Sequence, residues 1–372
     1  MKKILSLFAG VVLSLQVQAD PAASGEAIAA AINKRDLDAV LGTIDVEAVN
    51  RLVLKDLGLK DSDRDALRKG MPKGLRNNLA IGMKSIEASR GTARFMRAGV
   101  RGGKPYALVR LDLGDEGTDY VEYFLTPAGK VEDWYVHSMA TLYSTSARLS
   151  LATLFKTDSM LYGLFGSRIA SDADVKPFTE LRVNLQAQDY AAAYRTLERF
   201  PEGFRTTRQW ALMRVTYGAR MNDETHRAAL RHLAENFGND PELQFIFIDH
   251  HLFDEQFDRA LGSVAALERA IGGEDGATAN LRGTILASAR RFDAAAAACR
   301  RGMALEPDHK PAYWCLVNVG VATKSGKIAI EGLKAYERAF GMEFNLDKLA
   351  ALESYHAIAR TPEFAAWKKT RR

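Results

Sequence analysis

The chain has 372 residues, of which 51 are basic and 46 acidic, and its formal net charge is +5. Its hydrophobic fraction of 47% excludes a disordered chain, and the near balance of charges excludes a polyanion-binding tail over most of the length. Two cysteines are too few for a disulfide scaffold, and a mean hydropathy of −0.18 argues against several membrane spans. The length predicts a globular protein with two or three domains.

Residues 1–19 have the pattern of a signal peptide. Lys2 and Lys3 form a short basic start, residues 4–17 are almost wholly apolar, and Val17-Gln18-Ala19 places small residues as a signal peptidase requires. We expect cleavage after Ala19 and a mature periplasmic protein, and the absence of a nearby cysteine argues against a lipoprotein. An uncleaved anchor or a buried first helix is the alternative.

Residues 20–166 are predicted to form one domain that starts with helices. Apolar residues recur at helical spacing over residues 28–44, and Asp45 is expected to cap the next helix. Pro72 and the glycines on either side of it predict a break, with a new helix over residues 75–89.

Beyond Gly91 the apolar pattern changes to a period of two, which is typical of strands. Ala107 and Val109 are expected to face a core covered by the helices, and the opposite face, with Asp112 and Glu122, is expected to face solvent. The first domain is therefore predicted to be α+β, with helices on a four-stranded antiparallel meander. The predicted strands are residues 92–100, 105–113, 118–126 and 130–137.

This order of elements resembles the cystatin-like and nuclear-transport-factor-like folds. The resemblance implies a pocket between helices and sheet, in some members with a catalytic aspartate or histidine. The candidates here are Asp112, Glu122, Asp133 and His137. We favour their interpretation as ordinary surface charges.

The second half of the chain contains an internal repeat in which an aromatic residue is followed three residues later by alanine. The phrase occurs three times, as Tyr190 with Ala193, Phe257 with Ala260, and Phe292 with Ala295. The best copy reads GTILASARRFDAAAAACRRGMALEPD and resembles the tetratricopeptide repeat, a helix-turn-helix unit of 34 residues. In that family Gly283 matches the small residue where the two helices cross, and Pro307 matches the closing proline.

The resemblance implies an all-α solenoid of about five helix pairs over residues 177–343. Residues 167–176 are expected to be a linker, and residues 344–372 a capping helix over 346–360 followed by a solvated basic tail. The predicted units are residues 177–207, 208–241, 242–274, 276–309 and 310–343.

In tetratricopeptide proteins the first helix of each unit lines a concave groove that binds a peptide or a partner's helix. Asparagine side chains both donate and accept hydrogen bonds, and tryptophan is a common anchor in interfaces. The alternative is that these residues are merely exposed or pack between units. The residues carried over to this groove are Phe245, Asp249, Asn280, Thr284, Trp314 and Asn318.

Cys299 and Cys315 fall in predicted helices that are neighbours in the array. In an oxidising compartment such a pair is able to form a disulfide. The alternative is two buried thiols that point at different neighbours.

The sequence indicates no catalytic residue, no metal site and no cofactor. Asp249, His250 and His251 resemble a metal-binding cluster, but adjacent histidines on a helix point apart. Phosphate-binding loops and a nucleophile elbow are absent from the sequence.

The sequence therefore favours a non-enzymatic periplasmic adaptor that binds a protein or peptide, without nucleic acid and without a transmembrane span. The N-terminal domain is expected to supply a second contact surface or a dimer interface. The alternative is an N-terminal domain with a ligand-binding or hydrolytic pocket, for which the repeats recruit a partner.

Overall fold

A computed structural model describes residues 19–55, 57, 59–114, 117–155 and 172–371. The predicted signal peptide, apart from Ala19, lies outside these residues, as do residues 167–171 of the predicted linker 167–176. The chain divides into two compact units. The sheet unit comprises Met1–Val53, Asp65–Gly117 and Val121–Tyr135, and the helical unit comprises Leu54–Arg64, Thr118–Tyr120 and Val136–Arg372.

The sheet unit begins with three short helices, each preceded by an aspartate that caps it. The cap predicted at Asp45 is confirmed, since its Oδ1 accepts the backbone N–H of Ala48 at 2.9 Å. Asp20 and Asp36 cap the other two helices in the same way. The three helices are α1 (Pro21–Asn33), α2 (Leu37–Gly42) and α3 (Val46–Leu54).

The long helix α4 (Asp61–Ala88) corrects the predicted break at Pro72, because the helix continues through it. A proline inside a helix removes one backbone hydrogen bond. The helix α4 nevertheless continues on both sides of Pro72. Acidic residues in the first turn complement the positive end of the helix dipole. In the second half an apolar stripe packs into the core of the sheet unit, formed by Leu79, Met83 and Ile86.

The sheet has five strands in the order β1-β2-β3-β4-β5, and the predicted four-stranded meander is confirmed to within one residue at each end. The additional strand is β5, which is only two residues long and was not predicted. β1 pairs antiparallel with β2, with a bulge between Phe95 and Arg97. The strands are β1 (Thr92–Arg101), β2 (Lys104–Asp112), β3 (Thr118–Leu125), β4 (Val131–Val136) and β5 (Thr141–Leu142).

One face of the sheet packs against α1 and forms the core of the sheet unit, as predicted. Ile28 and Ile32 of α1 share a buried cluster with Ala107 and Val109 of β2. The Asn33 side chain fixes the end of α1 to β1 by exchanging two 2.7 Å hydrogen bonds with the backbone of Ala93.

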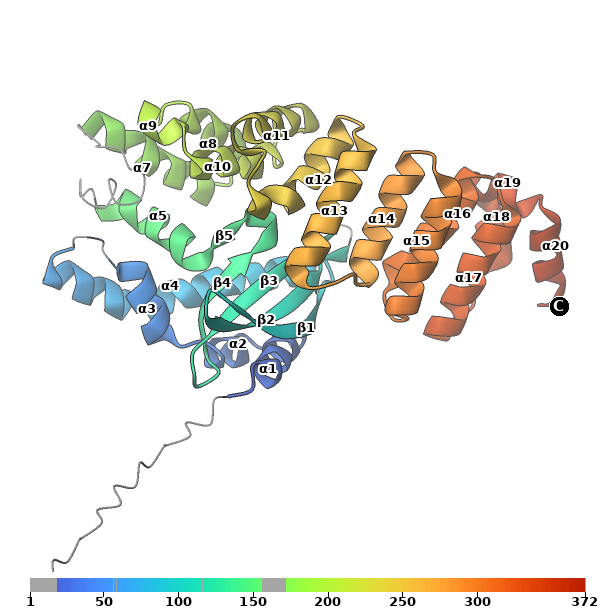
Figure 1. The fold of residues 1–372 in the computed structure, drawn as a ribbon, viewed down its shortest axis with the longest axis horizontal. Helices are drawn as coiled ribbons and strands as arrows, with labels where there is room; N and C mark the ends of the chain where they lie inside the picture. Colours follow the sequence, from blue (N-terminus) through green and yellow to red (C-terminus); the bar gives the residue numbers. More distant parts are fainter. Residues whose placement is uncertain (1–18, 56, 58, 115–116, 156–171, 372) are drawn as a thin grey trace, which may run out of the picture. The chain divides into compact units, whose positions relative to one another are not determined.

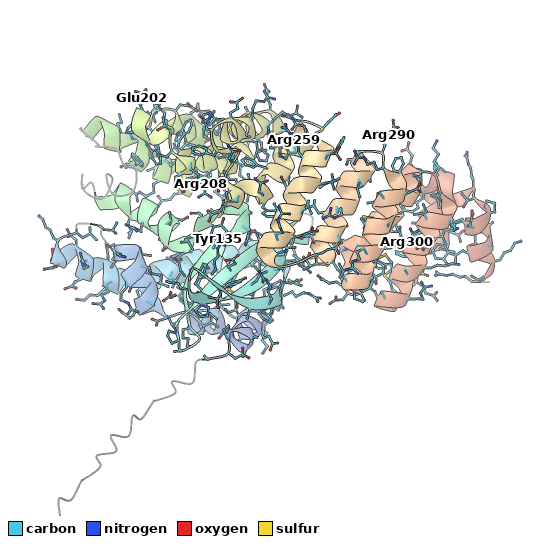
Figure 2. All side chains as sticks on the ribbon, viewed as in Figure 1. Tyr135, Glu202, Arg208, Arg259, Arg290 and Arg300 are labelled. Atoms are coloured by element: carbon cyan, nitrogen blue, oxygen red, sulfur yellow. A yellow bond between two sulfur atoms is a disulfide. The ribbon has the colours of Figure 1, made fainter. Side chains whose placement is uncertain are left out.

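The expectation that the opposite face meets solvent is wrong. Glu122 is 1% exposed, and Asp133 and His137 are each 5% exposed. Leu108 and Phe124 lie at the same alternate positions and are also buried, so this face is part of an interior despite its charges. Buried charges need partners. The ion pairs of this face include Arg101–Glu122 at 2.9 Å and Arg110–Asp112 at 3.0 Å. Figure 2 shows the side chains of the sheet and labels Tyr135 on it.

The helical unit continues with α5 (Tyr143–Phe155) and then contains five successive helix pairs, one for each predicted repeat. In Figure 1 helices α12 to α17 follow one another side by side. The first helix starts at Asp172 rather than at residue 177. The pairs are α7 (Asp172–Gln186) with α8 (Tyr190–Leu197), α10 (Arg208–Gly218) with α11 (Asp223–Phe237), α12 (Gln244–Phe253) with α13 (Phe257–Ile271), α14 (Gly276–Ser288) with α15 (Phe292–Leu305), and α16 (Lys310–Ala322) with α17 (Gly326–Phe340).

The C-terminal residues differ from the predicted single helix and solvated tail. Leu352 has extended backbone angles that end one short helix, and Pro362 opens another at a position where its missing N–H costs nothing. Trp367 is 3% exposed, and Arg371 pairs with Glu337, so the basic end packs against the array. The elements are α18 (Leu346–Ala351), η4 (Glu353–Tyr355), α19 (His356–Ala359) and α20 (Pro362–Lys369).

Candidate functional site: the face formed by the first helices

Small residues set the spacing of the two helices within each pair. One alanine of every second helix is fully buried, and the fifth of these, Ala329, was missed in the sequence because no aromatic residue precedes it. On the first helix of the last pair, a Cβ added to Gly320 would lie 2.6 Å from the Cα of Ala329. Such a close approach requires glycine on one side and alanine on the other. The buried alanines are Ala193, Ala229, Ala260, Ala295 and Ala329.

Cys299 of α15 and Cys315 of α16 form a disulfide, with their Cα atoms 5.6 Å apart. Closing a loop of this length stabilises a fold by about 3 kcal/mol on the chain-entropy account. Gly283 of α14 lies against the bond, and a Cβ at that position would be 2.6 Å from the sulfur of Cys315 and 2.8 Å from that of Cys299. Three helices from two successive repeats therefore meet at one point, which we call the disulfide junction.

The disulfide junction lies directly behind two of the predicted groove positions. The sulfur of Cys315 is 3.9 Å from the backbone oxygen of Asn280, and the Thr284 hydroxyl donates to the same oxygen at 3.1 Å. Thr284 and Asn318 are exposed, Asn280 is half-buried, and Asp249 is exposed on α12. We call these four residues, with Phe245 and Trp314, the first-helix face.

The two aromatic residues of the first-helix face are covered by other parts of the chain. Phe245 meets the ring of Tyr120 edge-on, with 6.3 Å between ring centroids. Trp314 packs on Tyr336 at 5.5 Å and on Phe344 at 5.9 Å, within the cluster that closes the C-terminal end. Trp314 therefore stabilises the cap, and the open positions of the face are the polar ones.

A shallow pocket of about 440 Å³ lies between α15, α16 and α17. It is lined by Arg300 and Arg338 together with Tyr313 and small apolar side chains. Arg300, labelled in Figure 2, makes two hydrogen bonds to Glu331 at 2.6 and 2.8 Å, which neutralise its charge. None of the residues predicted for the groove lines this pocket.

The histidine pair on α12 is largely removed from solvent, with His250 buried and His251 half-buried. Burial lowers the pKa of both His250 and His251, and the Nδ1 of His250 lies 3.9 Å from a carboxylate oxygen of Asp254. Among the residues that the structure describes, no three His, Cys, Asp or Glu side chains are grouped so as to hold a metal ion.

Within the described ranges no helix has the length and apolar character needed to cross a membrane.

No family model matches the sequence, and no curated protein matches it. Solved structures with some likeness include one described as MamA MSR-1 C2, with 14% identity and a TM-score of 0.35 over 45% of this chain and 94% of its own. PilW, described as a widely conserved type IV pilus biogenesis factor, has 15% identity and a TM-score of 0.35 over 54% of this chain and 93% of its own. Yeast Tom70 has 16% identity and a TM-score of 0.31 over 61% of this chain and 47% of its own.

These three proteins contain tetratricopeptide repeats. With TM-scores this low, the assignment of the array rests on its own helix bounds, its buried alanines and its close-approach glycines. By those features the C-terminal part is a tetratricopeptide-like solenoid that follows an α+β N-terminal part. The cystatin-like resemblance of the N-terminal part stays a prediction.

Gly283→Ala is expected to destabilise the protein by about 1–3 kcal/mol, because the new methyl group collides with both sulfurs of the disulfide. Gly262→Ala is the matched control on α13, where an added Cβ meets no atom within 4 Å and alanine favours the helix by up to about 1 kcal/mol. Urea unfolding of both variants tests this. Equal stability of the two would contradict the packing described at the disulfide junction.

Proposed function

We propose that the protein is an adaptor that binds a partner protein through the first-helix face. The observation that carries the proposal is the row of exposed or half-exposed polar side chains on α14 and α16, Asn280, Thr284 and Asn318, backed by the disulfide junction. Helices α14 and α16 contact each other, so these side chains belong to one surface.

The chemistry of this row favours an extended peptide. Amide and hydroxyl groups donate and accept hydrogen bonds, which matches the alternating N–H and C=O groups of a peptide backbone. The crosslinked backbone behind the row limits the conformational entropy that binding costs. Because none of the three residues is charged, we expect the affinity to depend little on ionic strength.

We also propose that the protein acts in the periplasm. The basic start, the apolar run and the Val17-Gln18-Ala19 site support export. Cleavage after Ala19 leaves α1 with its capping residue, since Asp20 accepts the N–H of Ala22 at 2.9 Å. A disulfide between the only two cysteines is in keeping with an oxidising compartment.

The alternative of a ligand-binding or hydrolytic N-terminal pocket gains no specific support. Its candidate residues Asp112 and Glu122 are each paired with an arginine, and neither Asp133 nor His137 is without a partner. Paired charges of this kind are explained by the burial of the face that carries them.

The double variant Asn280→Ala/Asn318→Ala is expected to weaken partner binding at least tenfold, because each lost amide removes hydrogen bonds to the peptide. Its melting temperature should stay within about 2 °C of the wild type, since Asn318 is exposed and Asn280 half-exposed. A partner for the measurement is obtained by placing a photo-crosslinking residue at Thr284 in periplasmic extract.

The matched control places the same crosslinker at Arg269, an exposed residue on the second helix α13. Crosslinked adducts that form at Thr284 and not at Arg269 support partner binding through the first-helix face. The proposal fails if both positions capture the same proteins, or if the double variant binds the captured partner as well as the wild type does.

Export is tested by the mass and N-terminal sequence of the protein recovered from the periplasm. The expected mature chain begins at Asp20, and Ala19→Lys should leave the precursor uncleaved because signal peptidase needs a small residue at that position. Full-length protein confined to the cytoplasm would contradict the proposal.

A further inference from the structure

Tyr120 occupies part of the first-helix face. Residues Thr118–Tyr120 belong to the helical unit, and Tyr120 is 1% exposed. Its hydroxyl donates a 2.8 Å hydrogen bond to Oδ2 of Asp275, and its ring meets Phe245 edge-on. The side chain thus lies between the first helices of two successive repeats, α12 and α14.

Asp275 is oriented for this contact by hydrogen bonds within the cap of its own helix, which do not involve Tyr120. Its Oδ1 accepts the backbone N–H of Thr278 at 2.8 Å, while the Thr278 hydroxyl accepts the N–H of Asp275 at 3.0 Å. This capping box starts α14 and fixes the carboxylate, so that Oδ2 faces the phenol. A ring surface and a fixed acceptor together select a phenol over a plain aromatic ring.

A second short segment holds Tyr120 in place. Asp119 accepts hydrogen bonds from the backbone N–H and the hydroxyl of Ser138, at 3.0 and 2.6 Å. The ring of His137 meets that of Tyr120 edge-on at 6.3 Å. These contacts fix residues 118–120, which therefore present the side chain of Tyr120 to α12 and α14 as an extended peptide would.

We propose that Phe245 and Asp275 form a tyrosine subsite on the first-helix face, that the chain's own Tyr120 fills it, and that a partner segment carrying tyrosine binds by replacing Tyr120. This inference rests on the proposed function and names the partner's chemistry. Phenylalanine cannot donate the hydrogen bond that Oδ2 of Asp275 accepts from Tyr120, and a phosphorylated tyrosine is repelled by the same carboxylate.

The probe is the acetylated peptide of residues 117–123, GTDYVEY, labelled for fluorescence polarisation. It is titrated into the mature chain and into its Tyr120→Ala variant, whose subsite is empty. We expect the variant to bind the peptide at least tenfold more tightly than the wild type, in which Tyr120 competes. A peptide with phenylalanine at position 120 should bind the variant about tenfold more weakly than the tyrosine peptide.

Equal binding to wild type and variant, or equal binding of the two peptides, overturns the inference. If Tyr120→Ala does not fold, Tyr120→Phe serves, since it keeps the ring and loses the hydrogen bond to Asp275. That chain should bind the tyrosine peptide more tightly than the wild type does, and unchanged binding overturns the inference.

Tyr355→Phe, in the C-terminal cluster, is the matched control and should leave peptide binding unchanged. An effect as large as that of Tyr120→Phe would also overturn the inference. The assay needs no partner protein, so its failure removes the tyrosine subsite and leaves the test at Asn280 and Asn318 standing.

Discussion

The helical unit depends on how closely α14 approaches the bond between Cys299 and Cys315. Gly283 has no side chain, and both sulfurs occupy the space that a Cβ would take. The same principle operates at the last pair, where Gly320 lies against Ala329. Close approach of neighbouring helices brings their exposed sides into one surface. The disulfide stiffens that surface beside the polar row of Asn280, Thr284 and Asn318.

The first-helix face is divided into three parts by what covers it. The ring of Tyr120 covers Phe245, and the cap cluster covers Trp314. The third part is the polar row, in which Asn280 is half-exposed and Asn318 is exposed. Under the proposed function, a partner that uses only the polar row would bind without displacing Tyr120. Under the proposed tyrosine subsite, a partner that also carries a tyrosine would have to displace Tyr120, which would lower its apparent affinity.

Local patterns predicted much of the fold because the forces behind them are local. Period-two alternation located the four longer strands, and the aromatic–alanine phrase located three of the five helix pairs. The burial of Glu122 was missed, although Leu108 and Phe124 on the same face were a usable signal. The helix through Pro72 was missed because packing of its second half outweighs a local break.

The candidate site was only partly predictable for the same reason. The polar positions Thr284 and Asn318 follow from the phase of the repeat, and the structure places them at the surface. The covering of Phe245 depends on Tyr120, which lies in a different part of the sequence and carries no repeat signal. Contacts of this kind arise only when the chain is folded.

The most direct test of the disulfide junction as the organiser of the first-helix face is amide hydrogen exchange on the oxidised protein and on Cys299→Ala/Cys315→Ala. The structure predicts that protection falls selectively in α14, α15 and α16, while α10 and α11 keep theirs. Unchanged protection in α14, or a uniform loss over all the repeats, would contradict it.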